Sequence, residues 1–200
     1  DCIFDTGDDC IAIKSGRNAD GRRVNVPSEN IIVSNCEMKA GHGGVVMGSE
    51  LSGGIRNVFV ENCRMSSPNL DRGIRIKTNA MRGGGVGNLN VRELEVGTVR
   101  DLFVINFYYE EGENGPFSPV VRGISFENIH CANAERVMDI RGFEHARIRD
   151  IRLRNVSIDH AAKPSRVSNV EGLVFDNVSA NGMPVSNRND LLATAAQEAF

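Results

Sequence analysis

The sequence lacks the features that mark membrane and nucleic-acid-binding proteins. No apolar run approaches the ~20 residues that a membrane-spanning helix needs. The chain has 23 basic against 26 acidic residues, so the basic surplus typical of a nucleic-acid-binding protein is missing. We therefore expect neither a membrane nor nucleic acid among its partners. The 200 residues are 40% hydrophobic and 24% charged, which suits one sizeable globular domain.

Cysteine is present in an odd number and without metal-binding spacing. An odd count excludes a complete set of disulfides, and no CxxC pair or Cys/His cluster offers ligands for zinc. We expect these side chains to act as small buried hydrophobes, and we expect neither a metal nor a cofactor. The five residues are Cys2, Cys10, Cys36, Cys63 and Cys131.

Amphipathic helical periodicity is also missing before the last residues, which argues against a βαβ fold. The chain instead repeats one pattern, apolar-x-apolar-x-Asn-apolar-x-apolar, with lags of 27, 31, 35, 27 and 22 residues. Alternation on both sides of the Asn predicts two short strands, and Asn tolerates the left-handed backbone of a tight corner. The six copies centre on Asn35, Asn62, Glu93, Asn128, Asn155 and Asn177.

A second strand-like run follows each of the earlier copies, so each repeat contributes about three short strands. Strands recurring at this spacing without helices predict an all-β fold, a parallel β-helix (solenoid) of about six to seven rungs. A β-sandwich is the alternative, but it would not place Asn at one strand position repeatedly. We assign residues 1–186 to the β-helix and residues 187–200 to a C-terminal tail, either a short helix or disordered.

Charged residues recur on equivalent strands at about one repeat interval. His42 lies 34 positions after Asp8, and Arg75 lies 33 after His42. Parallel strands lie ~4.8 Å apart, so Asp8 and Asp9, His42, and Arg75 and Lys77 should span only about 10 Å on one flank. Paired carboxylates suit glycosidic cleavage, and two outward cations suit an anionic substrate.

Each of these signals also has a structural interpretation when taken alone. The acidic pair could sit in a turn, His42 could be a turn histidine, and Arg75 with Lys77 could be a solvated pair. Asp8 and Asp9 are neighbours in a strand, so both reach one cleft only if the backbone bends, which we expect Gly7 to permit. Adjacent carboxylates should also raise each other's proton affinity, leaving one of them protonated as an acid.

As a set, the motifs resemble glycoside hydrolase family 28, the polygalacturonases and related pectin hydrolases. The resemblance implies a right-handed parallel β-helix that hydrolyses α-1,4-linked polygalacturonate by inversion without a metal. It implies that Asp8 is the general acid, Asp9 positions water, His42 supports the acid, and Arg75 and Lys77 bind galacturonate carboxylate. The motifs are Gly7-Asp8-Asp9-Cys10, Gly41-His42-Gly43 and Arg75-Ile76-Lys77.

One family motif, Asn-Thr-Asp, is expected one rung before Asp8 and is not in the sequence. The chain begins without Met in what reads as mid-strand, so we interpret it as an N-terminally truncated piece that is inactive by itself. A signal peptide further upstream would fit a periplasmic or extracellular monomer. A calcium-dependent pectate lyase-like enzyme and a non-catalytic glycan-binding β-solenoid are the alternatives, and a rhamnogalacturonan hydrolase is a variant of the first interpretation.

Two loops bear on how the substrate is held. The loop from Arg17 to Arg23 leaves the strand that follows the acids and could wall one end of a cleft, which favours exo action. The sequence of this loop resembles that of bacterial exo-acting members of the family, and Arg17 is a candidate substrate contact. Tyr108 or Tyr109 could stack on a sugar in a neighbouring subsite, with core packing as the equal alternative.

Overall fold

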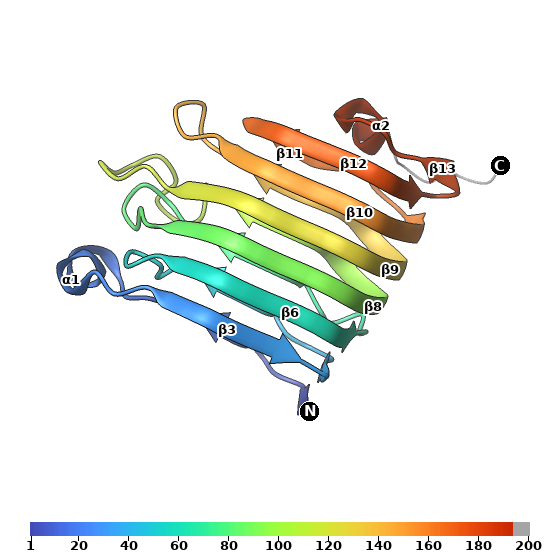
Figure 1. The fold of residues 1–200 in the computed structure, drawn as a ribbon, viewed down its shortest axis with the longest axis horizontal. Helices are drawn as coiled ribbons and strands as arrows, with labels where there is room; N and C mark the ends of the chain where they lie inside the picture. The colour runs from blue at the N-terminus through green and yellow to red at the C-terminus, as the bar shows by residue number, and fades with distance from the viewer. Residues whose placement is uncertain (194–200) are drawn as a thin grey trace.

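Parallel strands stack rung upon rung along the molecule (Figure 1). The structure, a computed structural model, describes residues 1–193. Successive copies of the repeat lie in register, so that Val58 pairs with Leu89, and Leu89 with Ile124. The pairing is parallel throughout the described residues except between the last two strands. The predicted parallel β-helix is confirmed, and the β-sandwich alternative was wrong.

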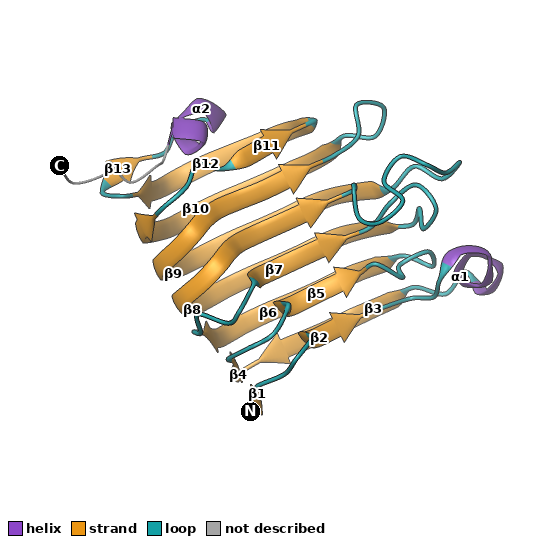
Figure 2. Ribbon diagram, turned by 180° about the vertical axis from the view of Figure 1, so that it is seen from behind, coloured by secondary structure: helices purple, strands orange, loops and turns teal. Residues whose placement is uncertain are grey.

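The strands form three flanks of the coil, and the longest strands bend from one flank onto the next. One flank starts with β2 (Asp9–Ile13), β5 (Gly43–Gly48) and β7 (Arg72–Lys77), which Figure 2 shows side by side. It continues through the ends of β8 (Gly85–Asn106) and β9 (Val120–Arg141) to β11 (Arg166–Ser168). The other flanks are formed by β1 (Cys2–Phe4), β3 (Ser28–Ser34), β4 (Cys36–Met38), β6 (Ile55–Met65), β10 (Ile148–Ala161), β12 (Val170–Ala180) and parts of β8 and β9.

Side chains fill the interior of the coil, so the function has to lie outside it. In β6, every inward position is buried, including Val58 and Val60. The rings of Phe103 and Phe126 stack at 3.9 Å between centroids on neighbouring rungs. Burying such a side chain stabilises the fold by about 1.5–3 kcal/mol, and the columns repeat this at each rung.

The Asn corners form as predicted, and a second corner accompanies them. All six central residues of the repeat, including Glu93, have left-handed φ values of 51–55°. Their amides form a ladder, in which Asn155 donates to Asn128 at 2.9 Å and Asn177 to Asn155 at 2.9 Å. The sequence signal for the second corner is an Asn, Asp or Gly five positions earlier. Its left-handed residues are Asn30, Asn57, Asn88, Gly123, Asp150 and Gly172.

Glu93 interrupts this ladder, and replacing it with Asn is expected to stabilise the protein. The Glu93 carboxylate accepts from Asn128 at 2.7 Å but has no N–H to donate to Asn62 on the other side. Glu93→Asn supplies that donor and a residue suited to φ 52°, so we expect a gain of about 0.5–1.5 kcal/mol in urea unfolding. Glu93→Gly relieves the backbone but also removes the acceptor of Asn128, so a gain equal to that of Glu93→Asn would show that the side-chain bonds at this corner contribute nothing.

The far end of the coil is covered by a short turn and helix. After β13 (Met183–Pro184), helix α2 (Arg188–Ala193) places Leu191 in a fully buried position. The Asp190 carboxylate accepts from the backbone N–H of Ser186 at 2.8 Å, which fixes the start of this helix. The boundary at residue 186 stays a prediction, and residues 194–200 of the tail lie outside the described part.

Two sequence expectations need correction. The polar loop after β2 contains helix α1 (Asn18–Val24), which had not been predicted. Cys2 is exposed rather than buried, while Cys131 is buried so deeply that desolvation raises the pKa of its thiol to about 12. None of the helices in residues 1–193 has both the length and the apolar character for a membrane span.

Candidate active site

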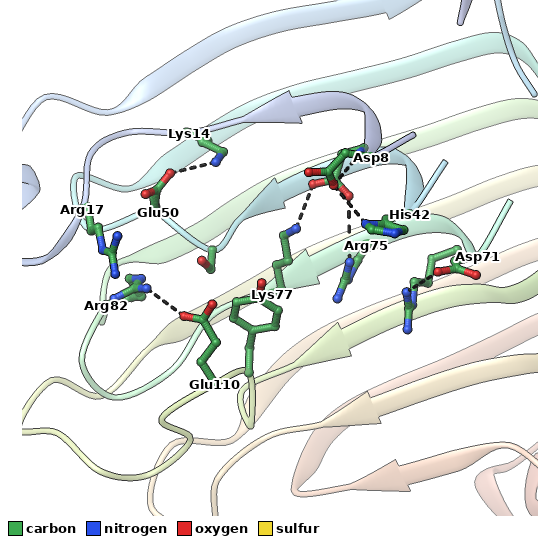
Figure 3. A pocket seen from close by; sticks show the side chains of 14 residues that line it. Asp8, Lys14, Arg17, His42, Glu50, Asp71, Arg75, Lys77, Arg82 and Glu110 are labelled. Carbon is green, nitrogen blue, oxygen red and sulfur yellow. Dashed lines mark hydrogen bonds and ion pairs between the residues drawn. The ribbon is translucent and has the colours of Figure 1, made fainter. Parts of the chain in front are cut away.

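A cleft of about 470 Å³ lies on the outer surface of β2, β5 and β7. Figure 3 shows its labelled side chains, with Asp8, His42 and Asp71 toward one end and Arg17 and Arg82 toward the other. Of the site residues named from the sequence, all but Tyr108 meet there. Asp8, Asp9, Arg17, His42, Arg75, Lys77 and Tyr109 all line the cleft.

The two carboxylates have opposite surroundings. The Asp8 side chain is 81% exposed, whereas that of Asp9 is 6% exposed. Asp9 Oδ2 accepts from Lys77 Nζ at 2.8 Å, but Asp9 Oδ1 is buried and has no hydrogen-bond partner among residues 1–193. The nearest guanidinium atom, on Arg75, lies 3.9 Å from Oδ1, too far for a hydrogen bond. Asp9 thus has a free acceptor at the floor of the cleft.

The bend that brings both carboxylates into the cleft does not come from Gly7. Strand β2 begins at Asp9, so Asp8 lies before the alternation of the strand applies. Gly7 lacks a left-handed φ and has open space around its Cα, so a larger residue would fit there. The Asp8 carboxylate instead accepts the backbone N–H of Asp9 at 2.8 Å, which holds the bend.

The expected proton on Asp8 is not supported by its surroundings. The N–H of Asp9 and then the His42 ring, despite some opposing desolvation, hold the pKa of the Asp8 carboxyl below its usual value. The cations beside Asp9 offset the repulsion that was expected to raise the proton affinity of Asp8. In the free protein, Asp8 is therefore ionised at neutral pH.

His42 reaches Asp8 because glycine brings two rungs close together. Gly41 has φ 150°, and a Cβ there would lie 2.4 Å from the carbonyl oxygen of Asp8. The backbone N–H of His42 donates to that same oxygen at 3.0 Å. His42 Nδ1 then lies 3.1 Å from Asp8 Oδ1, with the ring 56% exposed to the cleft. The Gly-His-Gly motif thus has a geometric role that its sequence alone could not show.

Arg75 and Lys77 share the outward face of β7, as their spacing predicts. Their side chains are 11% and 10% exposed, so they lie in the cleft floor rather than in open solvent. Burial, and then the neighbouring Arg72, lowers the pKa of Arg75 from its usual value. Arg75 Nε is buried and has no partner in the described part of the chain, which leaves a donor available for a carboxylate or hydroxyl group.

The two tyrosines lie in different places. The Tyr109 ring lies 5.7 Å from the Arg75 guanidinium carbon and 5.5 Å from Lys77 Nζ, within the range of cation–π contacts. Tyr108 is not among the side chains that line the cleft; it packs edge-on against Phe143 at 5.0 Å. Of the two candidates, Tyr109 is therefore the one placed to meet a ligand.

Several charged residues that the motifs did not reveal also line the cleft. Lys14 pairs with Glu50 at 2.7 Å, and Arg82 pairs with Glu110 at 2.9 Å. In total, six cationic side chains balance five carboxylates, so the cleft does not share the negative charge of the chain and admits an anionic ligand. Among residues 1–193, no group of three His, Cys, Asp or Glu side chains could hold a metal ion.

The fold and the site together define a class of protein. It is a parallel β-helix with an open cleft on its flank, where two carboxylates and a histidine lie beside buried cations. The chain belongs to the glycosyl hydrolases family 28, whose sequence model matches residues 1–181. The coil is right-handed, as the resemblance implied.

Relatives in sequence and structure agree with this family. A probable polygalacturonase of Vitis vinifera is 30% identical over 86% of this chain and 37% of its own length. An exo-poly-alpha-D-galacturonosidase of Dickeya chrysanthemi is 37% identical over 45% of this chain and 14% of its own. The crystal structure of an exopolygalacturonase from Thermotoga maritima superposes with a TM-score of 0.84 at 37% identity, over 91% of this chain and 41% of that one. The chain thus spans less than half the length of these relatives.

Proposed function

We propose that this chain carries part of the active site of a polygalacturonase, a hydrolase of the α-1,4-galacturonosidic bonds of polygalacturonate. One observation carries the proposal: an exposed acid, a buried carboxylate with a free oxygen, and two cations meet in one cleft. The named activities of the relatives support the choice of substrate.

Each group has a role in an inverting reaction. Arg75 and Lys77 bind the carboxylate of a galacturonate unit, with the Arg75 Nε donor unsatisfied until then. Asp8 gives its proton to the leaving oxygen as the glycosidic bond breaks, while Asp9 Oδ1 accepts a hydrogen bond and then the proton of the water that attacks the sugar carbon. His42, at 3.1 Å from Asp8, supports the acid through its hydrogen bond.

Asp8 has to gain its proton on the way to the transition state. Its carboxyl is ionised in the free protein because Asp9 N–H and His42 stabilise the charged form. A bound uronate excludes water and adds a negative charge nearby, and both effects raise the pKa of a carboxyl group. Binding of the anionic substrate therefore prepares the acid.

A further carboxylate is required for full turnover. The resemblance implies an Asn-Thr-Asp motif, which residues 1–193 do not provide. The other carboxylates of the cleft are engaged with cations: Glu50 with Lys14, Glu110 with Arg82, and Asp71 with arginines. We therefore propose that these 200 residues alone do not turn over substrate and that a longer form, exported to the periplasm or beyond and monomeric, does. Chain-end (exo) action is our choice over internal cleavage, because the Arg17–Arg23 segment stands at one end of the cleft.

The proposal is tested by the products formed from polygalacturonate by a longer form of the chain that includes an Asn-Thr-Asp rung. We expect new reducing ends, no rise in ultraviolet absorbance from an unsaturated product, and unchanged rates with a chelator. Calcium-dependent absorbance would instead show a lyase. For the 200-residue chain, we expect trigalacturonate to shift the NMR signals of the Arg75 Nε–H group; binding without cleavage by the longer form would show a glycan-binding module.

A further inference from the structure

One end of the cleft is bordered by an end wall, which we define as α1 together with the loops 49–54, 78–84 and 107–119. These segments come from four successive rungs, and their sequences do not resemble one another. Figure 3 shows Arg82 and Glu110 of this wall, and Arg17 just before α1, at the end of the cleft away from His42 and Asp71. The labelled side chains are spread along the strand direction, from Asp71 at one end to Arg17 at the other, so a polymer that lies in this direction would meet the wall.

Arg82 lies at the centre of the end wall. Its side chain is 2% exposed, although it belongs to a surface loop. One guanidinium nitrogen donates to Asn18 Oδ1 of α1 at 2.9 Å, and another donates to Glu110 at 2.9 Å. The side-chain oxygen of Asn79 accepts the backbone N–H of Arg82 at 2.9 Å and so fixes the loop that carries it. One side chain thus ties α1 to a loop three rungs away.

Arg22 of α1 makes the reciprocal contact. It donates to the carbonyl oxygens of Met81 and Arg82, each at 3.1 Å. Its guanidinium carbon lies 3.6 Å from the centroid of the Phe117 ring, a close cation–π contact. Arg23, the next residue, has a 72% exposed side chain, and within residues 1–193 its one ion pair is with Asp20, at 3.4 Å. Of these two adjacent arginines, Arg22 therefore holds α1 against the rest of the wall, and Arg23 does not.

α1 needs these contacts because it is weak by itself. It has seven residues, too few for a stable isolated helix, and Gly21 lies inside it. Gly21 is required there, since a Cβ would lie 2.6 Å from the Gly16 backbone. Arg17, just before α1, is exposed, lines the cleft and makes no ion pair with residues 1–193. The cation is thus free for a ligand, and its position depends on the wall behind it.

We infer that Arg82 is a positioning residue that keeps this end of the cleft closed and so restricts cleavage to the end of the polymer. Arg17, held in place by the wall, then meets the carboxylate of the terminal uronate. This inference rests on the proposed function. It assigns to Arg82 the role of determining where along the substrate cleavage occurs. Arg82 acts through the wall and not by contact with substrate, because its side chain is only 2% exposed; the contact is made by Arg17.

The first test measures the wall without catalysis, by hydrogen exchange of the α1 amides in the 200-residue protein. Arg82→Met should speed this exchange about tenfold or more, because the loss of bonds to a charged group opens the segment locally. Arg22→Met removes a less buried side chain and should also speed the exchange of the α1 amides. It takes the place of Arg82→Met in this test if Arg82→Met fails to fold. Arg23→Met is the matched control and should leave exchange unchanged. Unchanged exchange in both Arg82→Met and Arg22→Met would overturn the inference.

The second test measures viscosity loss per bond cleaved in polygalacturonate, using a longer form with an Asn-Thr-Asp rung. The unsubstituted enzyme should release terminal units with little viscosity loss. Arg82→Met should raise the viscosity loss per bond several-fold, and Arg82→Lys should lie between. Faster α1 exchange with unchanged products, or internal cleavage by the unsubstituted enzyme, would overturn the inference. No cleavage by the unsubstituted enzyme would refute the proposed function instead, and the exchange result would still decide whether Arg82 holds the wall.

Discussion

Asp8→Asn is expected to lower turnover of polygalacturonate by about 10²- to 10⁴-fold, the usual contribution of a positioned general acid. The amide keeps the shape of the side chain and can still meet His42, but it has no proton to give to a leaving oxygen. The side chain is 81% exposed, so the free energy of unfolding should change by no more than about 0.5 kcal/mol. Initial rates of reducing-end release by a longer form carrying Asn-Thr-Asp, with a urea unfolding curve, test both expectations.

Asp5→Asn is the matched control for this prediction. Asp5 is also an exposed carboxylate, three residues earlier, and it does not line the cleft. It should leave both rate and stability unchanged. Turnover of Asp8→Asn within a factor of about two of the parent would remove Asp8 from the role of acid.

The lowered pKa of Asp8 adds a pH dependence with a definite sign. Only protonated Asp8 can act as the acid, so kcat/KM should fall as pH rises through the pKa of the free protein, which lies below the usual carboxyl value. The bound uronate raises this pKa, so kcat should persist to higher pH than kcat/KM. In Asp8→Asn, neither kcat/KM nor kcat should show this fall with rising pH.

Local sequence rules were sufficient for the coil and for the position of its chemistry. The alternation of apolar and polar residues predicts which face of each strand is buried. The Asn at the centre of each repeat predicts the corner, because a single residue is enough to adopt a left-handed backbone. Stacking the copies then brought Asp8, His42 and Arg75 together, since parallel neighbours are one strand spacing apart. Even Glu93, which breaks the pattern, takes the same backbone conformation as the Asn residues.

What the sequence could not show depends on contacts between segments that do not repeat. Helix α1 forms through Arg22 and Asn18, whose partners lie about 60 residues further along the chain. The ionisation of Asp8 depends on the hydrogen bond from Asp9 N–H and on how close His42 and Lys77 come from other rungs; the motifs name these residues but not this geometry. Arg82 carries no motif and is recognisable only by being buried in a surface loop.

A second large effect is expected for a buried ion pair beside the cleft, between Asp101 and Arg136. The two residues are in register on β8 and β9, with 2.8 Å between Asp101 Oδ1 and an Arg136 guanidinium nitrogen, and their side chains are only about 10% exposed. Arg136 Nε also donates to the carbonyl of Pro164 at 3.0 Å. Arg136→Met should destabilise the protein by about 3–5 kcal/mol, because the buried Asp101 carboxylate loses its hydrogen-bonded cation and keeps Arg100 only at 3.8 Å, while the Pro164 carbonyl loses its donor. Urea unfolding followed by circular dichroism measures this loss.

Two comparisons separate the cost of an unpaired charge from the value of the pair itself. Asp101→Leu combined with Arg136→Met removes both charges, and should recover most of the lost stability because apolar side chains can replace a buried pair at little cost. Arg154→Met removes an exposed arginine that lies 3.5 Å from Glu127, and should cost less than about 1 kcal/mol. A double variant as unstable as Arg136→Met would show that the pair itself, rather than the stranded carboxylate, stabilises this flank. Asp101 is the strand neighbour of Arg72, which lines the cleft. Such a result would therefore also mean that the ion pair helps to hold the cleft floor in place.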